Sequence, residues 1–347
     1  MNCRHLCQLS LLFLLFVLPV NGLAATGTTK ILKIASLAPA GSVWIAQFEK
    51  FAEQVSRDTG GTVKFRTYPG GVMGEDQAMY RKMRVGQLHG GGFTMTGIAA
   101  VVPDFRVLAV PFLFTSYAEV DHVLAGVLPS LKERFREKGL ELVAVTEVGF
   151  LYAMSTKAVN SIESLRQTAN WSPSGDPLSE VYLSTLGITP VQLTIPDVLS
   201  SLQSGLVETV YNSFYGSIVM QWFTKARYIV DYPYGYAYGA FALDGKTFAA
   251  LSPKEQEAIN NAASVHFPVL LADTRRSNEA SRTVLAERGT TFLDIDPVSR
   301  NTLEQARDQA VDRLIPAELS RDIYQQASRL LEEYRHSAGP RQTGTNN

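Results

Sequence analysis

The sequence predicts a mixed α/β fold with parallel strands, because strand and helix patterns alternate in its central part. Within residues 165–215, short apolar runs at 191–193 and 207–211 follow helical patterns at 178–186 and 198–203. This alternation is typical of parallel α/β units, whose ligands bind beyond the carboxyl ends of the strands. The length of 347 residues suits two lobes or one large domain.

The charge balance and the amino terminus narrow the class of protein. The chain has 32 Lys and Arg against 33 Asp and Glu, so nothing favours a nucleic-acid partner. An apolar run at residues 9–20 is too short to span a bilayer, and Leu23-Ala24-Ala25 follows it. We interpret residues 1–25 as a cleaved signal peptide, with a retained membrane anchor as the alternative. Cys3 and Cys7 precede the apolar run, so the mature chain would contain no cysteine.

The first part of the chain alternates strands and helices, which are predicted at residues 31–36, 43–56, 63–68 and 75–85. Ser42 is a candidate N-cap for the first helix. The glycine-rich loop at 69–74 lacks the Gly-Lys-Ser/Thr ending of a phosphate-binding loop, so it is predicted to be a tight turn.

A second group of elements leads to a predicted crossing between lobes. Residues 90–96 form a strand of small residues, which indicates that a ligand or another strand comes close. The apolar run 107–114 contains Pro111 and is expected to be an edge strand or a bend. After a helix at 117–138, a buried strand at 140–148 runs into residues 149–155, the candidate crossing.

Four tyrosines between residues 232 and 239 alternate with small residues. They predict a strand that is apolar on one face and wet on the other, or one that places a ring or two against a ligand. Ser252, Pro253 and Glu255 then mark the start of a long helix that reaches about Leu285. The pair at 275–276, two arginines on this helix, is expected to face solvent.

A search for catalytic chemistry finds none. The sequence has no Gly-x-Ser-x-Gly motif, and the histidines at 89, 122, 266 and 336 have no partner at metal-ligand spacing. We therefore predict no catalytic residue, no metal site and no cofactor. Aromatic and small polar residues near strand ends instead indicate a mostly apolar ligand cleft, although each aromatic residue alone could equally belong to the core. The candidates are Trp44, Phe93, Phe150, Trp171, Asn212, Phe214, Tyr215, Tyr236 and Tyr238.

An ordered set of motifs resembles the DctP-type solute-binding subunits of TRAP transporters, which are ion-gradient-driven uptake systems. The resemblance covers about residues 31–334. The motifs are ILKIASLAPAGSVWIAQFEKFAEQV, GGTVKFRTYPGGVMGEDQAMYRKMRVGQLHGG, VLAVPFLFTSYAEVD and GDPLSEVYLSTLGITPVQLTIPDVLSSLQSGLVETVYNS.

This resemblance implies a two-lobed α/β binding protein of the periplasm with crossing strands and a long lobe-spanning helix. Lobe I would comprise residues 30–148 with 239–277, and lobe II residues 149–238 with 278–335, before a disordered tail at 336–347. It also implies a small-molecule ligand in the cleft, delivery to integral-membrane subunits, a monomeric state and no enzymatic activity.

The chain departs from the family where the ligand is usually held. An arginine of lobe II commonly clamps a carboxylate, and Trp171 stands at that position here. Leu151 occupies the place of a second arginine, whereas Asn212 and Asp76 are retained. These replacements predict an apolar or amphipathic ligand. The alternatives are a binding protein for a sensor or another non-transport partner, and an exported enzyme on this fold.

Overall fold

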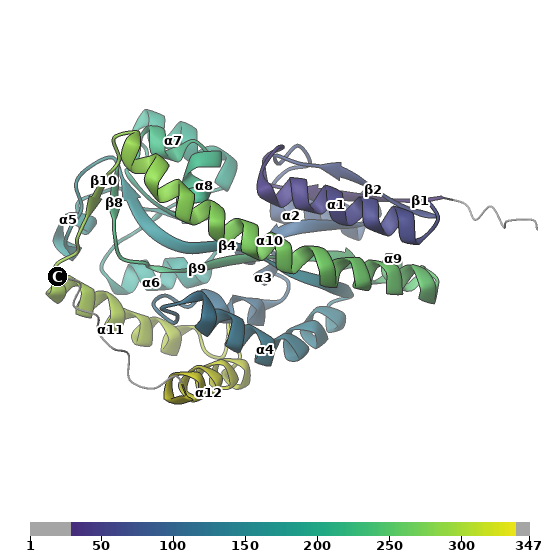
Figure 1. The fold of residues 1–347 in the computed structure, drawn as a ribbon. Coiled ribbons are helices and arrows are strands. Elements are labelled where there is room, and N and C mark those ends of the chain that lie inside the picture. The colour runs from purple at the N-terminus through teal and green to yellow at the C-terminus, as the bar shows by residue number, and fades with distance from the viewer. Residues whose placement is uncertain (1–28, 338–347) are drawn as a thin grey trace, which may run out of the picture.

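The computed structural model describes residues 29–337, so the predicted signal peptide at 1–25 lies outside the described residues. The chain builds an eight-stranded mixed sheet and a two-stranded sheet, with helices on both faces (Figure 1). The strands are β1 (Lys30–Ser36), β2 (Val63–Tyr68), β3 (Gly90–Thr94), β4 (Leu140–Ser155), β5 (Trp171–Pro173), β6 (Val191–Leu193), β7 (Thr209–Asn212), β8 (Tyr228–Val230), β9 (Gly235–Asp244) and β10 (Thr291–Leu293).

Helices of very different length cover these sheets. The α-helices are α1 (Val43–Asp58), α2 (Asp76–Arg84), α3 (Met95–Ala99), α4 (Tyr117–Glu137), α5 (Ile162–Arg166), α6 (Pro177–Thr185), α7 (Val198–Ser204), α8 (Phe214–Val219), α9 (Gly245–Ala249), α10 (Pro253–Glu287), α11 (Pro297–Leu314) and α12 (Arg321–Ser337). Three short 3-10 helices are η1 (Pro103–Ala109), η2 (Ile195–Asp197) and η3 (Trp222–Thr224).

Two antiparallel strands, β4 and β9, run through both lobes. The sheet order is β10-β8-β4-β9-β3-β1-β2, and β7 also pairs with β4. The start of β4 pairs with β9, and its end pairs with β7 and β8. A register shift between Glu147 and Gly149 interrupts the pairing with β9, and Gly149 has a φ of 109° there. The predicted crossing strands are therefore present.

The long helix α10 packs on both lobes. Its 35 residues span roughly 50 Å at 1.5 Å per residue. The capping box predicted at Ser252 and Glu255 is present. In lobe I, Phe267 stacks on Phe241 of β9 with ring centroids 5.7 Å apart, and at the other end Leu285 joins the core of lobe II. The helix therefore holds the two lobes along one side of the crossing strands (Figure 1).

The carboxyl-terminal helix α12 packs on α4 of lobe I. Ile323, Ala327 and Leu331 belong to the same apolar cluster as Val123 and Val127 of α4. The sequence-based lobe boundaries assign residues 278–335 to lobe II, and they remain a prediction. The last two residues of α12 fall within the predicted tail, whose remaining residues, 338–347, lie outside the described part of the chain.

Of the two alternatives for residues 107–114, an edge strand or a bend, the structure shows the bend, because η1 and a turn at Pro111 take up this run and bury Val107 and Leu108 in the core of lobe I. The expectation of a wet face on the tyrosine strand is wrong, because both faces of β9 are covered. Tyr236 and Tyr238 pack into one apolar cluster, and Phe241 and Leu243 on the opposite face pack into another. Tyr236 and Tyr238 are accordingly only 2% and 1% exposed.

The central unit is parallel only in part. β5 and β6 pair in parallel, as predicted, with Trp171 opposite Val191. β7 instead pairs antiparallel with β4, which brings Asn212 opposite Tyr152 at the crossing. The small residues of β3 allow β9 to come close, as predicted. A Cβ on Gly90 would lie 2.6 Å from the carbonyl oxygen of Ala242 on β9.

Candidate ligand-binding site

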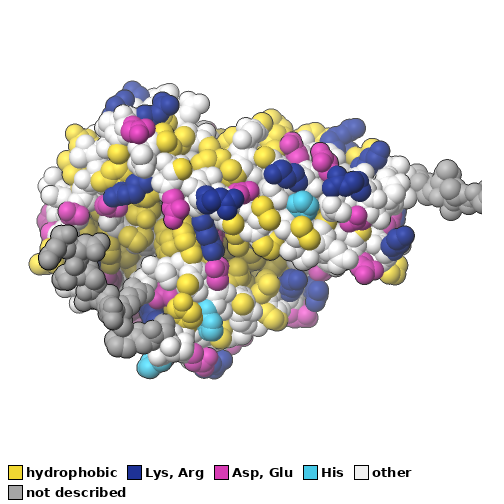
Figure 2. All heavy atoms as spheres, in the orientation of Figure 1, with side chains coloured by type: hydrophobic (Ala, Val, Ile, Leu, Met, Phe, Trp, Pro, Cys, Tyr) yellow, Lys and Arg dark blue, Asp and Glu magenta, His cyan; other side chains and the backbone are white. Residues whose placement is uncertain are grey.

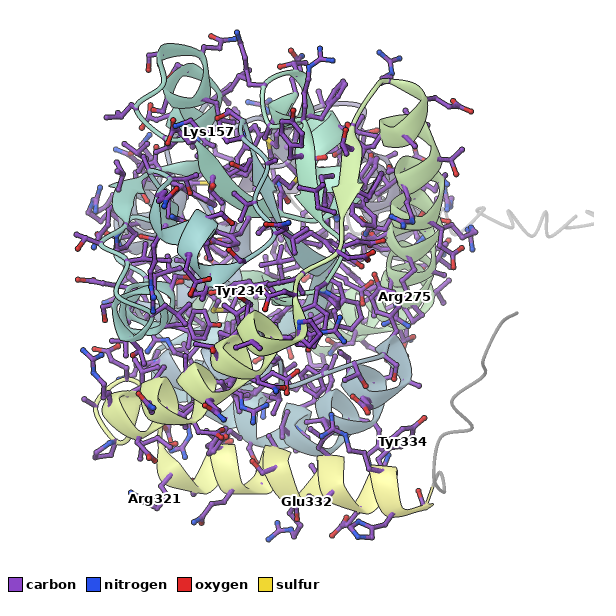
Figure 3. All side chains as sticks on the ribbon, turned by 90° about the vertical axis from the view of Figure 1, so that its left-hand side faces the viewer. Lys157, Tyr234, Arg275, Arg321, Glu332 and Tyr334 are labelled. Atoms are coloured by element: carbon purple, nitrogen blue, oxygen red, sulfur yellow. The ribbon has the colours of Figure 1, made fainter. Side chains whose placement is uncertain are left out.

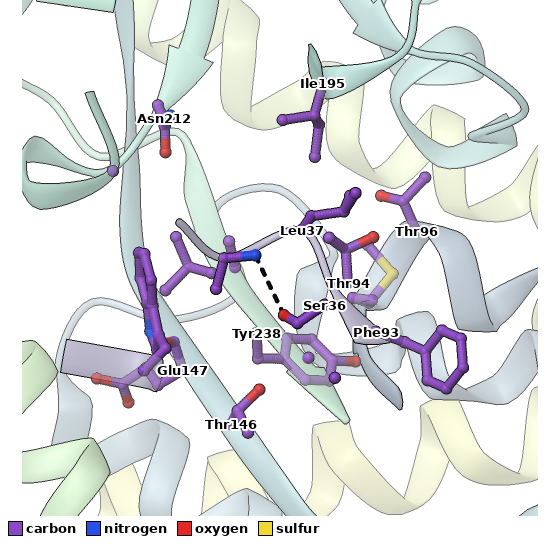
Figure 4. Close-up of a pocket in the computed structure, with 18 of the residues that line it drawn as sticks. Ser36, Leu37, Phe93, Thr94, Thr96, Thr146, Glu147, Ile195, Asn212 and Tyr238 are labelled. Atoms are coloured by element: carbon purple, nitrogen blue, oxygen red, sulfur yellow. Dashed lines mark hydrogen bonds between the residues drawn. The ribbon is translucent and has the colours of Figure 1, made fainter. Parts of the chain in front are cut away.

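A cavity of about 240 Å³ lies between the lobes, beside the crossing strands. This volume is slightly below the roughly 300–1,000 Å³ of common small-molecule sites. Figure 4 shows Asn212 and Ile195 on one side of the cavity and Ser36, Thr94 and Thr146 on the opposite side. The dashed line in that view is the hydrogen bond that Ser36 Oγ accepts from the backbone nitrogen of Ala38 at 3.1 Å.

Most of the candidates chosen from the sequence line this cavity. They are Trp44, Phe93, Leu151, Trp171, Asn212, Tyr236 and Tyr238. The remaining candidates are not among its lining residues. They are Asp76, Phe150, Phe214 and Tyr215.

Trp171 offers the cavity an apolar surface. Its indole nitrogen donates a hydrogen bond to the carbonyl oxygen of Leu193 at 3.0 Å, and its ring packs edge-on against Trp222 at 5.3 Å. The side chain is 3% exposed, so the indole N–H has already found its partner inside the protein. Trp171 therefore contributes apolar area and shape to the cavity wall.

The charged residues in the cavity wall are both acidic. Glu147 and Asp176 line it, and no Lys, Arg or His does so within the described residues 29–337. The outer face in Figure 2, by contrast, mixes Lys and Arg with Asp and Glu. Lys157 lies away from the cavity residue Tyr234 (Figure 3) and pairs with Glu208 at 2.6 Å.

The carboxylate of Glu147 is neutralised inside the protein. Arg275 of α10 donates to it at 2.7 Å, and the Tyr236 hydroxyl donates to it at 2.8 Å. Burial raises the pKa of Glu147, while the hydrogen bonds and charge of Arg275 act in the opposite direction. The expectation that Arg275 faces solvent is wrong, because this arginine also binds Asp121 and lies over the ring of Tyr117.

Asp176 is the other carboxylate in the wall. It caps α6, and its Oδ2 accepts hydrogen bonds from the backbone and the hydroxyl of Ser179. Its Oδ1 has no hydrogen-bond partner within the described part of the chain. Burial raises the pKa of Asp176, so an anionic ligand group beside it would be electrostatically unfavourable.

Asn212 and Asp76 hold different positions. Asn212 lines the cavity, its Oδ1 accepts from the backbone nitrogen of Ser213, and its Nδ2 makes no hydrogen bond within the described residues. Asp76 lies behind the wall, where it accepts from the backbone nitrogen of Thr94 at 3.2 Å and from the Thr94 hydroxyl at 2.5 Å. Asp76 thus fixes a threonine that itself lines the cavity.

The other candidates outside the wall support it through ring contacts. Phe150 packs on Tyr117 and Tyr236, and Phe214 stacks on Tyr152 at 4.0 Å. Sequence reasoning missed several lining residues, because single apolar or hydroxyl residues carry no distinguishing signal. They include Leu37, Met95, Thr96, Ser179, Ile195, Tyr211, Met220 and Trp222.

Comparisons with known proteins identify the family. Residues 34–317 match the family described as bacterial extracellular solute-binding protein, family 7. A solute-binding protein of Roseobacter denitrificans is 23% identical over 286 residues, which cover 79% of this chain and 84% of the relative. The 2,3-diketo-L-gulonate-binding periplasmic protein of Escherichia coli is 22% identical over 62% of this chain and 66% of its own length.

Solved structures share the fold. The sugar acid binding protein of Advenella mimigardefordensis, in complex with galactonate, has a TM-score of 0.82 at 19% identity and covers 89% of this chain and 99% of its own. A TRAP periplasmic solute-binding protein of Desulfovibrio salexigens, with bound orotic acid, has a TM-score of 0.79 at 18% identity, with coverages of 87% and 97%. No helix within residues 29–337 is long and apolar enough to cross a membrane.

The family model covers most of the chain, from residue 34 to residue 317. The chain therefore belongs to family 7 of the bacterial extracellular solute-binding proteins, the DctP-type periplasmic receptors of TRAP transporters.

Proposed function

We propose that this receptor captures an apolar or amphipathic organic molecule and delivers it to the integral-membrane subunits of a TRAP transporter. The observation that carries the proposal is the lack of Lys, Arg and His among the described residues of the cavity wall. A carboxylate buried there would find no cation to compensate for its lost hydration, and such a burial is costly.

Aromatic and aliphatic side chains supply the favourable contacts for such a ligand. Trp44, Trp171 and Trp222 line the cavity together with tyrosines of β7 and β9. Burial of apolar surface is worth roughly 25 cal/mol per Å², and aromatic rings offer large areas with little conformational freedom to lose. The amide Nδ2 of Asn212 can donate a hydrogen bond to a polar group of the ligand.

The ligands in solved structures of similar proteins differ in charge from the ligand proposed here. Those above contain galactonate and orotic acid, and a TRAP solute-binding protein of Haemophilus influenzae contains L-gulonate. All three ligands are acids. We propose that the replacement of the usual arginines by Trp171 and Leu151 moved this receptor away from acidic ligands of that kind. We also propose that residues 1–25 are a cleaved signal peptide that directs the chain to the periplasm. There the receptor works as a monomer.

The ligand can be identified directly. The mature protein is purified from its native periplasm without unfolding, and the molecule released on denaturation is analysed by mass spectrometry. In parallel, the ligand-free protein is titrated with N-phenyl-1-naphthylamine, a neutral aromatic probe, and with D-glucuronate. We expect a released molecule of low polarity and tighter binding of the neutral probe. A released sugar acid, or preferential binding of D-glucuronate, would overturn the proposed ligand class.

A further inference from the structure

Tyr215 was expected to contact the ligand, yet it lies behind the cavity wall against Trp44. The ring centroids of these two residues are 5.1 Å apart. The Tyr215 hydroxyl accepts a hydrogen bond from the backbone nitrogen of Val43 at 3.0 Å. Val43 is the first residue of α1 in lobe I, and Tyr215 belongs to α8 in lobe II (Figure 1). This hydrogen bond therefore joins the two lobes.

The bond is part of a closed circuit around the strand crossing. The backbone nitrogen of Tyr215 donates to Asn278 Oδ1 at 3.0 Å, and Asn278 Nδ2 donates to the carbonyl oxygen of Val148 at 2.9 Å. The indole nitrogen of Trp44 donates to the carbonyl oxygen of Glu147 at 2.7 Å. Val43 and Trp44 are consecutive residues of α1, and Glu147 and Val148 are consecutive residues of β4. These two covalent links and the four hydrogen bonds together form a closed ring of contacts.

Some members of the circuit line the cavity and others do not. Trp44, Glu147 and Val148 belong to the wall, whereas Tyr215 and Asn278 lie outside it. A ligand that contacts Trp44 therefore contacts a side chain whose position depends on residues that the ligand never touches.

The lobe-joining bond has a clear dependence on closure. The first backbone N–H groups of a helix have no partner inside the helix, so Val43 must find an acceptor elsewhere. When the lobes are apart, water can serve as that acceptor. When they close, the Tyr215 hydroxyl replaces water, and without it the N–H would be partly buried with no acceptor.

We propose that Tyr215 is a positioning residue for ligand binding, which stabilises the closed arrangement of the lobes and holds Trp44 in the cavity wall. It acts from lobe II on the start of α1, without contact to the ligand. The inference rests on the proposed function only in requiring that a ligand occupies this cavity, whatever its polarity.

Two substitutions remove the bond from opposite sides. Tyr215→Phe deletes the acceptor and keeps the ring beside Trp44. Val43→Pro deletes the donor N–H, and proline is well tolerated at the first position of a helix. Ser42 already has the extended backbone that a residue before proline prefers. Tyr182→Phe is the matched control, since the Tyr182 hydroxyl donates to the carbonyl oxygen of Leu303 within lobe II.

Lobe closure is measured as the distance between spin labels on Glu53→Cys of α1 and Gln203→Cys of α7, two exposed positions. The labels are specific because Cys3 and Cys7 are the chain's only cysteines and both lie in the proposed signal peptide, which the protein used for labelling lacks. Distances are recorded without titrant, with N-phenyl-1-naphthylamine and with D-glucuronate. In the condition that gives the wild type its short distance, we expect Tyr215→Phe and Val43→Pro to lose most of that population and Tyr182→Phe to retain it.

The affinity for the titrant that closes the wild type gives the second readout. Loss of one hydrogen bond of ordinary strength should weaken binding about 3- to 10-fold in Tyr215→Phe. The double variant with Val43→Pro should be no weaker than either single variant. Tyr182→Phe should lower the unfolding midpoint without this loss of affinity. Distance distributions of Tyr215→Phe that coincide with the wild type in all three conditions would overturn the inference. Closure by D-glucuronate alone would instead count against the proposed ligand class.

Discussion

Arg275 of the lobe-spanning helix lies outside the cavity lining and binds the buried carboxylate of Glu147 at 2.7 Å. Its guanidinium also binds Asp121 at 2.6 Å, so one arginine joins α10 to β4 and to α4. The side chain of Glu147 is completely buried, and the Tyr236 hydroxyl is its other hydrogen-bond partner. The charge of Glu147 is thus matched within the protein and is not available for a ligand.

We predict that Arg275→Gln destabilises the fold strongly. Removing the arginine leaves a buried carboxylate without its cation, which typically costs about 3–5 kcal/mol. The neighbouring Arg276→Gln is the control, because Arg276 is exposed and pairs with Asp273 on its own helix. Exposed pairs of that kind contribute about 0–1 kcal/mol. Urea unfolding of both variants measures the difference, and equal losses would contradict a structural role for the Arg275–Glu147 pair.

The sequence was informative wherever a local rule decides the structure. The capping box at Ser252 follows from residues close together in the chain, and so does the turn after β2, where Gly70 and Gly71 have positive φ. The motif resemblance added that the chain forms two lobes, which the crossing strands and the long helix connect. The division into lobes depends on contacts between distant segments, which a periodicity within one segment does not reveal.

The sequence was uninformative wherever the partner is distant in the chain. Arg275 resembles any exposed helical arginine until the fold places it against Glu147, which lies 128 residues away. Tyr215 and Phe214 are adjacent aromatics, yet one binds α1 and the other stacks inside lobe II. The predicted wet face of the tyrosine strand is wrong because the pattern alone does not distinguish a strand with one exposed face from a strand covered on both faces.

We predict that Gly149→Ala disturbs the crossing more than a comparable glycine substitution elsewhere. Gly149 has a φ of 109°, and an added Cβ would lie 2.6 Å from Asn278 Nδ2. Gly205→Ala is the control, since Gly205 also has positive φ but nothing lies within 4 Å of its Cβ position. The left-handed backbone of Gly205 costs a non-glycine residue about 1–2 kcal/mol, and the φ of 109° at Gly149 lies further from the values that alanine adopts. The additional destabilisation of Gly149→Ala, measured by urea unfolding, then reports this backbone difference together with the contact with Asn278.

We predict that Asp76 makes the folded protein less stable as the pH rises. Burial raises its pKa from 3.8 to about 7, against the opposing effect of the Thr94 hydrogen bonds. The folded state therefore keeps a proton that the unfolded state releases above pH 3.8. The resulting stabilisation is complete below that value and is lost as the pH rises to about 7. At about 1.4 kcal/mol per pKa unit, the loss is at most ~4 kcal/mol.

Asp76→Asn provides the test, because it cannot titrate and retains a similar shape beside Thr94. We expect its free energy of unfolding to change less than that of the wild type between pH 4 and pH 8. The variant should also be the more stable protein at pH 8. Parallel pH profiles of the two proteins would show that Asp76 does not carry a raised pKa.

We predict that Leu151→Arg turns the cavity toward acidic ligands. Leu151 lines the cavity, and its carbonyl oxygen accepts a hydrogen bond from the backbone nitrogen of Tyr234. Since that contact uses the backbone, the substitution leaves it in place. A hydrogen bond to a charged group contributes about 1.5–3 kcal/mol, so D-glucuronate should bind roughly 10- to 150-fold more tightly than to the wild type.

The control is Leu151→Met, which changes the shape of the side chain without adding charge. Calorimetric titration with D-glucuronate and with N-phenyl-1-naphthylamine compares the three proteins. We expect Leu151→Arg to bind D-glucuronate more tightly and the neutral probe more weakly than the wild type. Leu151→Met should show no increase in affinity for D-glucuronate. If the new guanidinium formed an ion pair with Asp176, the affinity for D-glucuronate would not increase, while the affinity for the neutral probe would still fall. A wild type that already binds D-glucuronate as tightly as Leu151→Arg would show that this cavity needs no cation to hold an acid.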